Sequence, residues 1–239
     1  MHVDGLKGLN LRHSFLIYFL LSSFMFFISY FLIPYLSNIT KIEVIFFWFL
    51  VSSLFVFFPL LLLSYIFLKK ENRSSSISTW VVRLRFRKLN LADLKLTLFG
   101  IVLILVCSGL LLKSIEFLSG PFNQSPSFMM FKPIVNNRYW ILFLWFPSWI
   151  LNIMGEEIFW RGLILPRQEL NFGKYAWLIH GIGWSLFHIA FGWQLLITLF
   201  PLIFIQSYIV QKTRNSWTGV IIHAGISGPG FIAMAFGLV

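Results

Sequence analysis

Cysteine and acidic residues are scarce in this 239-residue chain, which has one cysteine and eight aspartate or glutamate residues. The lone thiol, Cys107, lies in an apolar run and has no second cysteine with which to form an intrachain disulfide. A metal site built from several thiolates is excluded for the same reason. We therefore interpret Cys107 as a small apolar residue of the interior.

Charge of either sign is also sparse, because 11% of the residues are charged against roughly 25% in a soluble domain. Hydrophobic residues make up 58% of the chain and the mean hydropathy is +0.83. This composition excludes a soluble globular protein and predicts an integral membrane protein that contacts the lipid bilayer. The net charge of +11 reflects basic loops and comes without an RNA- or DNA-binding motif, so no nucleic-acid partner is expected.

Apolar runs long enough to cross a membrane recur along the whole chain. They cover residues 15–35, 44–68, 96–117, 139–165, 175–191, 195–210 and 217–238. The first run is too long for the core of a signal peptide and is predicted to be a retained span. Without repeats or a long linker, residues 1–239 form one integral membrane domain. The predicted fold is an all-α, polytopic transmembrane helix bundle of about seven spans, with a short sixth span.

The loop at 69–95 carries the densest cluster of basic residues and defines the expected orientation. The positive-inside rule places this loop in the cytoplasm, and therefore the N-terminus too. Apolar and basic residues alternate over 81–86, so this segment is also suited to lie on the membrane surface. We favour a solvated cytoplasmic loop.

Three charged residues interrupt the fourth run, where a charge at bilayer depth costs about 2.5–3.5 kcal/mol. Glu157 and Arg161 are four residues apart, on one helix face, and are predicted to form an ion pair. Glu156 is rotated roughly 100° from Glu157 and lacks this partner. The alternative is that all three mark a helix end at the cytoplasmic interface.

Two further runs each contribute imidazoles. His180 and His188 lie in the fifth run with Trp184 midway between them, and His223 lies in the seventh, one turn before Ser227. His180 is interpreted as structural. Straight spans would leave Glu156 and His188 about 10 Å apart in depth unless the fifth span is shifted, tilted or broken at Gly192.

Ionisable groups from three spans favour a shared polar centre over isolated structural roles. A carboxylate and an imidazole can activate a water, and a second imidazole can stabilise the oxyanion that follows. Alternatively, Glu156, His188 and His223 can hold a divalent metal such as zinc with one open position. The sequence leaves both schemes open.

The order of these motifs resembles the CPBP intramembrane proteases, the ABI or CAAX-protease family. The resemblance rests on Glu156-Glu157-x-x-x-Arg161, then Trp184-x-x-x-His188, then His223-x-x-x-Ser227. It covers the chain from about Trp149, within a family-like part at about 139–239. It implies a bacterial plasma-membrane protein.

The resemblance implies roles residue by residue. Glu156 and His188 match the pair that activates water, and Glu157 and Arg161 match the supporting pair. His223 matches the histidine that stabilises the oxyanion or binds metal.

Two positions depart from the family pattern. Trp184 stands where phenylalanine is frequent. Ser227 stands where asparagine is usual, and its hydroxyl is a shorter donor.

The predicted function is an intramembrane endopeptidase that hydrolyses a peptide bond of a membrane-associated peptide or protein. The alternative is an inactive relative that acts as a bacteriocin-immunity or membrane scaffold protein, for which Ser227 is the argument. A proton-relay transporter is disfavoured because no inverted repeat is found.

Overall fold

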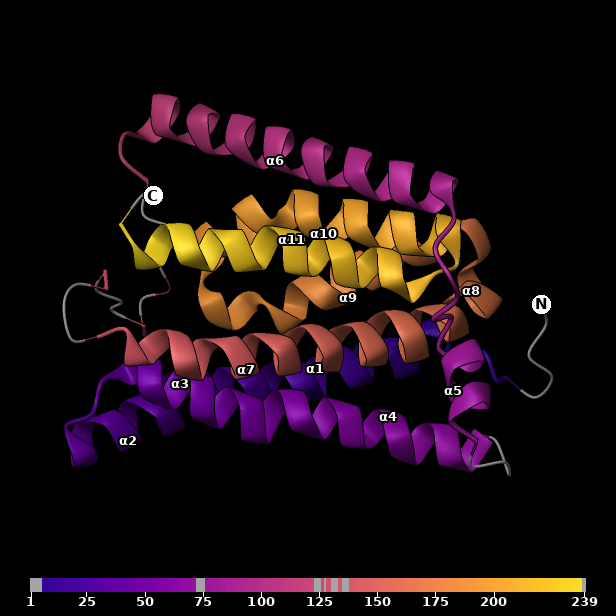
Figure 1. The fold of residues 1–239 in the computed structure, drawn as a ribbon, viewed down its shortest axis with the longest axis horizontal. Coiled ribbons are helices and arrows are strands. Elements are labelled where there is room, and N and C mark those ends of the chain that lie inside the picture. The colour runs from indigo at the N-terminus through magenta and orange to yellow at the C-terminus, as the bar shows by residue number, and fades with distance from the viewer. Residues whose placement is uncertain are drawn as a thin grey trace.

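The computed structural model describes residues 6–71, 76–122, 126, 128–129, 133–134 and 138–237. Within these ranges the chain forms helices and no strands, so the predicted all-α bundle is confirmed. The long helices lie side by side along the long axis of the molecule (Figure 1). A helix satisfies all its backbone hydrogen bonds internally, which is why apolar runs of this length adopt it.

Each of the first two apolar runs forms one long helix with a π-helical turn inside it. The first comprises α1 (Leu11–Phe27), η1 (Ile28–Leu32) and α2 (Ile33–Thr40), and the second α3 (Val44–Ser52), η2 (Ser53–Phe57) and α4 (Phe58–Glu71). Pro59 has no N–H to donate back along the helix, and the π-helical turn η2 ends two residues before it.

The alternating basic segment does not form a solvated loop, and that expectation is wrong. The predicted loop at 69–95 contains α5 (Ile77–Arg83), which overlaps the start of this segment and folds onto the end of the bundle. Arg83 is 3% exposed and its Nε lies 2.7 Å from Glu71 Oε2, while Arg85 Nη1 lies 2.7 Å from Glu169 Oε1. The carboxylates of Glu71 in α4 and Glu169 in α8 therefore pair with these basic residues. Residues 72–75 of the expected loop lie outside the described ranges.

The helix α6 (Leu91–Ser119) begins at a capping box. The Asn90 side chain accepts from the backbone N–H of Asp93, and the Asp93 carboxylate accepts from that of Asn90. With 29 residues the helix is about 44 Å long. One face packs on α10 and α11, and the rest is exposed on an outer side of the bundle (Figure 1).

The family-like part starts with a continuous helical stretch, Trp140–Phe187, that doubles back on itself. It comprises α7 (Trp140–Glu156), η3 (Glu157–Ile164), α8 (Leu165–Phe172), η4 (Gly173–Tyr175) and α9 (Ala176–Phe187). The chain turns at α8 and returns along α9 (Figure 1). Gly173, with φ +52°, supplies the positive φ at which α8 ends.

The fifth apolar run is shorter as a helix than predicted, and the sixth is longer. The 12-residue α9 ends at Phe187. After the short η5 (Ile189–Phe191), the helical path is interrupted at Gly192, which has φ +88°. The following α10 (Trp193–Thr213) has 21 residues, so the expected short sixth span is wrong. The last helix is α11 (Ser216–Ala235).

Six helical stretches of the described chain are long and apolar enough to cross a membrane. Trp140–Phe187 is one of these six stretches, and it contains both α7 and the returning α9. The start of α1 and the end of α11 lie at opposite ends of the bundle (Figure 1), as an odd number of passes requires.

The segments predicted to share one side of the membrane meet at one end of the bundle. Leu9 N–H donates to the Arg167 carbonyl over 2.9 Å, and Ser216 N–H donates to the Arg85 carbonyl over 2.9 Å. The loop that precedes α1, the start of α8, the segment after α5 and the start of α11 are therefore adjacent. This arrangement is the one expected from the positive-inside rule.

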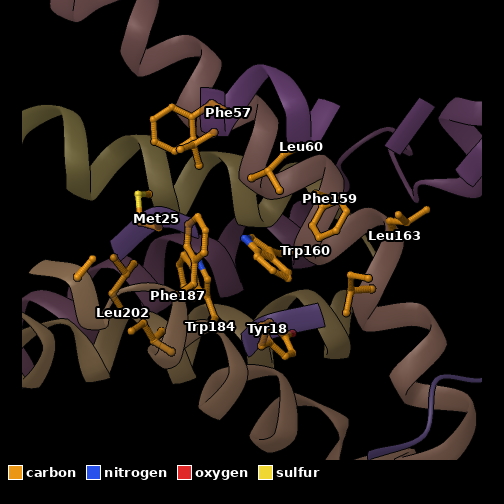
Figure 2. Close-up of a cluster of buried hydrophobic side chains, with 14 of the residues drawn as sticks. Tyr18, Met25, Phe57, Leu60, Phe159, Trp160, Leu163, Trp184, Phe187 and Leu202 are labelled. Atoms are coloured by element: carbon orange, nitrogen blue, oxygen red, sulfur yellow. The ribbon is translucent and has the colours of Figure 1, made fainter. Parts of the chain in front are cut away.

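The core lies between α1, α4, η3, α9 and α10 (Figure 2). Trp160 is fully buried and its ring stacks on Tyr18 with centroids 4.8 Å apart. Phe187 packs against the edge of Trp160 at 5.4 Å. These large side chains fix how close η3 and α9 come to each other, and therefore where Glu156 and Trp184 lie.

Candidate active site

Glu156 is the last residue of α7, and the residue is 2% exposed. Its Oε2 accepts a hydrogen bond from the Trp184 indole N–H over 2.7 Å. Its Oε1 accepts one from the Asn152 side-chain amide over 2.8 Å. Glu156, for which the sequence predicted no ion-pair partner, is thus held by two neutral donors. Among the described residues no basic side chain forms an ion pair with it, and Arg161 pairs with Glu157 instead.

Glu157 begins the π-helical turn η3, and its side chain is fully buried. The predicted ion pair is confirmed, because Arg161 Nη1 lies 3.1 Å from Glu157 Oε1. The same oxygen accepts from Gln206 Nε2 over 2.8 Å. A π-helical turn is uncommon and is frequent at functional sites. Glu156 and Glu157 are adjacent and differ by about 100° around the helix, so each carboxylate meets different partners.

His223 reaches Glu157 from α11. Its Nδ1 lies 2.9 Å from Glu157 Oε1, and the ring is 5% exposed. Since an ionised carboxylate only accepts, Nδ1 carries a proton and Nε2 is the nitrogen left for another partner. Glu157 is therefore both the partner of Arg161 and the group that orients His223, a contact the sequence reasoning missed.

His188 follows α9 directly and caps it. Its Nδ1 lies 2.9 Å from the Trp184 carbonyl, so Nδ1 is again the protonated nitrogen and Nε2 is left. No hydrogen bond joins His188 to Glu156 in the described residues.

Trp184 is the side chain that links the site. Its ring centroid lies 5.0 Å from that of His188 and 5.6 Å from that of His223. The guanidinium carbon of Arg161 lies 3.4 Å from the indole centroid, in a cation–π contact. A phenylalanine could provide the ring contacts, but only tryptophan also donates the N–H to Glu156. The departure from the family pattern at this position therefore adds a hydrogen bond.

Ser227 does not point a free donor into the site. Its hydroxyl donates to the His223 carbonyl over 2.8 Å, one turn back on its own helix. Its oxygen accepts from the Trp149 indole N–H over 3.2 Å. The hydroxyl proton is thus bonded within α11. Ser227 therefore does not offer the free side-chain donor that the asparagine usual in the family would provide.

His180 lies apart from these groups, as expected for a structural residue. Its Nδ1 lies 2.9 Å from both Tyr18 Oη and Gln168 Oε1. Gln168 Nε2 continues the network to Ser14 over 3.2 Å. The network ties α1, α8 and α9 together, and it contains neither Glu156 nor Glu157.

Asn152 and Gln206 are the two functional candidates that the sequence reasoning missed. Each is a polar side chain inside an apolar run, Ile150–Met154 and Leu202–Tyr208 respectively. Such a residue is costly in a membrane unless it finds a partner. Asn152 also lies four residues before Glu156, on the same helix face. That spacing is the signal by which it could have been found.

The predicted set of metal candidates does not fit a three-ligand site. Among the described residues, no group of three or more His, Cys, Asp or Glu side chains is arranged to hold a metal ion. Each carboxylate oxygen of Glu156 already accepts a hydrogen bond, Oε2 from Trp184 and Oε1 from Asn152. The reaction is therefore considered below without a metal.

The fold and site together define a class of protein, a membrane-embedded helix bundle that buries a glutamate–arginine pair and two histidines beside a second glutamate. In a comparison with protein-family models, residues 138–228 match the family described as type II CAAX prenyl endopeptidase Rce1-like. The match spans the predicted site from Glu156 to Ser227, and the predicted resemblance is confirmed for this part of the chain. Comparisons with curated proteins and with solved structures gave no match.

Proposed function

We propose that the protein is an intramembrane endopeptidase that hydrolyses a peptide bond in a membrane-associated peptide or protein. The family match supports a CAAX-protease-like activity in general. The observation that carries the proposal is the arrangement around Trp184, which is bonded to Glu156 and lies against His188 and His223. A buried carboxylate with two imidazoles beside it is a set of groups able to activate water and stabilise an oxyanion.

In the first step Glu156 acts as the general base. It removes a proton from a water molecule, and the resulting hydroxide attacks the carbonyl carbon of the scissile peptide bond. His188 presents Nε2 as an acceptor that helps to hold the water. Trp184 and Asn152 each donate one hydrogen bond to the carboxylate and hold it in one orientation.

In the second step the carbonyl oxygen carries the negative charge of the tetrahedral intermediate. His223 in its protonated form donates Nε2–H to this oxygen, while its Nδ1–H remains bonded to Glu157. The negative charge of Glu157 stabilises that imidazolium. Collapse of the intermediate breaks the C–N bond, and the proton held by Glu156 passes to the leaving amine. The products are a carboxylate and an amine.

The family description names a prenyl endopeptidase, whereas the contacts described above concern the peptide bond and not a prenyl group. We therefore propose the wider class of membrane-associated peptides. The basic end of the bundle, where α5, α8 and the N-terminal segment meet, is assigned to the cytoplasm of a bacterial plasma membrane.

The proposal is tested with purified protein in liposomes and two quenched fluorogenic peptides, one farnesylated at a C-terminal CAAX sequence and one unmodified. Glu156→Gln preserves shape but removes the base, and cleavage should be lost. Glu116→Gln is the matched control, because Glu116 forms a surface ion pair with Lys113 far along α6. Full activity of the Glu156→Gln protein would overturn the assignment.

One observation favours a second function, that of an inactive relative that binds a partner in the membrane. Ser227 uses its hydroxyl proton within its own helix, so the oxyanion would have one donor fewer. In this case neither peptide is cleaved by the wild-type protein.

A further inference from the structure

Asn152 is a polar side chain in the middle of an apolar segment of α7. The residues around it are Ile150, Leu151, Ile153 and Met154. An amide in such a segment is costly unless it finds a hydrogen-bond partner in the bundle. Its one hydrogen bond to a described residue is to Glu156, one helical turn further on.

The donor and the acceptor of this hydrogen bond follow from the chemistry of the two groups. Glu156 as a carboxylate only accepts, so the amide nitrogen of Asn152, and not its oxygen, faces Oε1. The indole N–H of Trp184 occupies Oε2 in the same way. Each carboxylate oxygen has a second lone pair, and these remain for a water molecule. The carboxylate is therefore fixed at both oxygens without losing its capacity to accept a proton.

Neutral donors suit this task better than a cation. A guanidinium paired with Glu156 would compete with the proton that a base must accept, whereas an amide and an indole orient the carboxylate and leave its charge in place. The one guanidinium near the site, that of Arg161, lies instead against the face of Trp184 and is paired with Glu157.

Two other donors close to this part of α7, those of Trp149 and Ser227, already have partners. The indole N–H of Trp149, three residues earlier on α7, is used by Ser227. The hydroxyl of Ser227 is used by the His223 carbonyl. Loss of the Asn152 amide would remove the one donor that Oε1 of Glu156 has among the described residues.

We propose that Asn152 is a positioning residue that holds Glu156 in the orientation in which it activates water. This inference rests on the proposed endopeptidase function. Asn152 acts through Glu156 and contacts no reacting atom, so its loss slows the chemical step more than it weakens substrate binding.

The test is the Asn152→Leu variant, which keeps the volume of the side chain and removes the amide. Ser148→Ala is the matched control, because Ser148 lies one turn earlier on α7 and accepts a buried hydrogen bond from Ser53 over 2.9 Å. With the farnesylated fluorogenic peptide, kcat of Asn152→Leu should fall roughly 10- to 100-fold, with KM changed less than about twofold. The thermal midpoint should match that of Ser148→Ala.

A kcat of Asn152→Leu equal to that of the control would overturn the inference. So would a loss of activity that follows a fall in the thermal midpoint, since a residue needed only for folding gives that result. If activity is lost in Glu156→Gln but kept in Asn152→Leu, the role of Asn152 is refuted and the proposed endopeptidase function stands.

An infrared measurement tests the inference even if neither peptide is cleaved. The difference spectrum between wild type and Glu156→Gln isolates the carboxylate bands of Glu156. Removal of a donor shifts the carboxylate stretch, so these bands should move in the Asn152→Leu background and stay in place in Ser148→Ala. Unchanged bands in Asn152→Leu would show that the amide does not hold Glu156.

Discussion

Nδ1 of His223 lies 2.9 Å from Oε1 of Glu157, and this contact joins the last helix to the π-helical turn inside the bundle. The same carboxylate is paired with Arg161 at 3.1 Å. Glu157 therefore has two tasks, to neutralise a buried guanidinium and to orient an imidazole. The first of these concerns stability and the second concerns the proposed chemistry, so the two can be separated by mutation.

Glu157→Gln should destabilise the fold by about 3–5 kcal/mol, because it leaves the Arg161 charge buried without a counter-charge. Activity should fall as well, since the His223 imidazolium loses its anion. In the double variant Glu157→Gln/Arg161→Met the unpaired charge is gone, so stability should recover while activity does not. Thermal unfolding and peptide cleavage measure the two effects. A double variant less stable than either single variant would contradict this explanation.

Trp184→Phe should keep an aromatic face for Arg161 and remove the N–H donated to Glu156. A hydrogen bond to a charged group contributes about 1.5–3 kcal/mol, so kcat should fall roughly 10- to 100-fold. The control is Trp177→Phe on the same helix, where the ring contacts Phe204 and Tyr208 away from the site. Equal kcat values in the two variants would count against the role of the indole N–H.

Ser227→Ala should change kcat by less than about threefold, because the hydroxyl proton is bonded to the carbonyl of the same helix and the net value of such a bond is about 1 kcal/mol. Ser227→Asn should raise kcat, since an amide is long enough to reach the oxyanion. Steady-state cleavage assays on both proteins distinguish the two effects. A large loss in Ser227→Ala would mean that the hydroxyl takes part directly.

Gly155→Ala should be strongly destabilising. A Cβ atom on Gly155 would lie 2.7 Å from the Phe57 backbone carbonyl oxygen, which cannot move aside as a side chain can. Overpacking of this kind costs about 1–3 kcal/mol. Gly109→Ala is the control, because a Cβ there meets no atom within 4 Å, and it should be neutral or slightly stabilising. Equal thermal midpoints for the two variants would refute the close approach of α7 and η2.

A metal chelator should leave cleavage unchanged. The basis is the geometry of the described site, in which Glu156 accepts from Trp184 and Asn152 and no three-ligand group is formed. The measurement compares initial rates with and without EDTA, followed by addition of zinc. Loss of activity with EDTA and its return with zinc would refute the water-activation scheme proposed above.

Much of the local structure follows from the sequence because it depends on near neighbours. Runs of about 20 apolar residues must be helical in a membrane, since no water is present to satisfy the backbone. The i, i+4 spacing of Glu157 and Arg161 predicts their ion pair, and it forms. The basic loops predict which segments share one end of the bundle.

The contacts that make a site were decided by the tertiary structure. Glu156 meets Trp184 across 28 residues, and Glu157 meets His223 across 66. Membrane helices are apolar on most faces, so hydrophobic periodicity does not show which faces meet. Close packing at Gly155 and the stacking of Trp160 on Tyr18 set those approaches instead.

The sequence by itself therefore determined that the chain is helical, which basic segments share one end of the bundle, and the residue types with catalytic capacity. The tertiary structure alone decided that Glu156 is held by Trp184 and Asn152, that Glu157 orients His223, and that Ser227 turns back on its own helix. The reason is physical. Helix formation is governed by bonds within a few residues, whereas the direction of each buried polar group is governed by whichever partner the packed helices bring within reach.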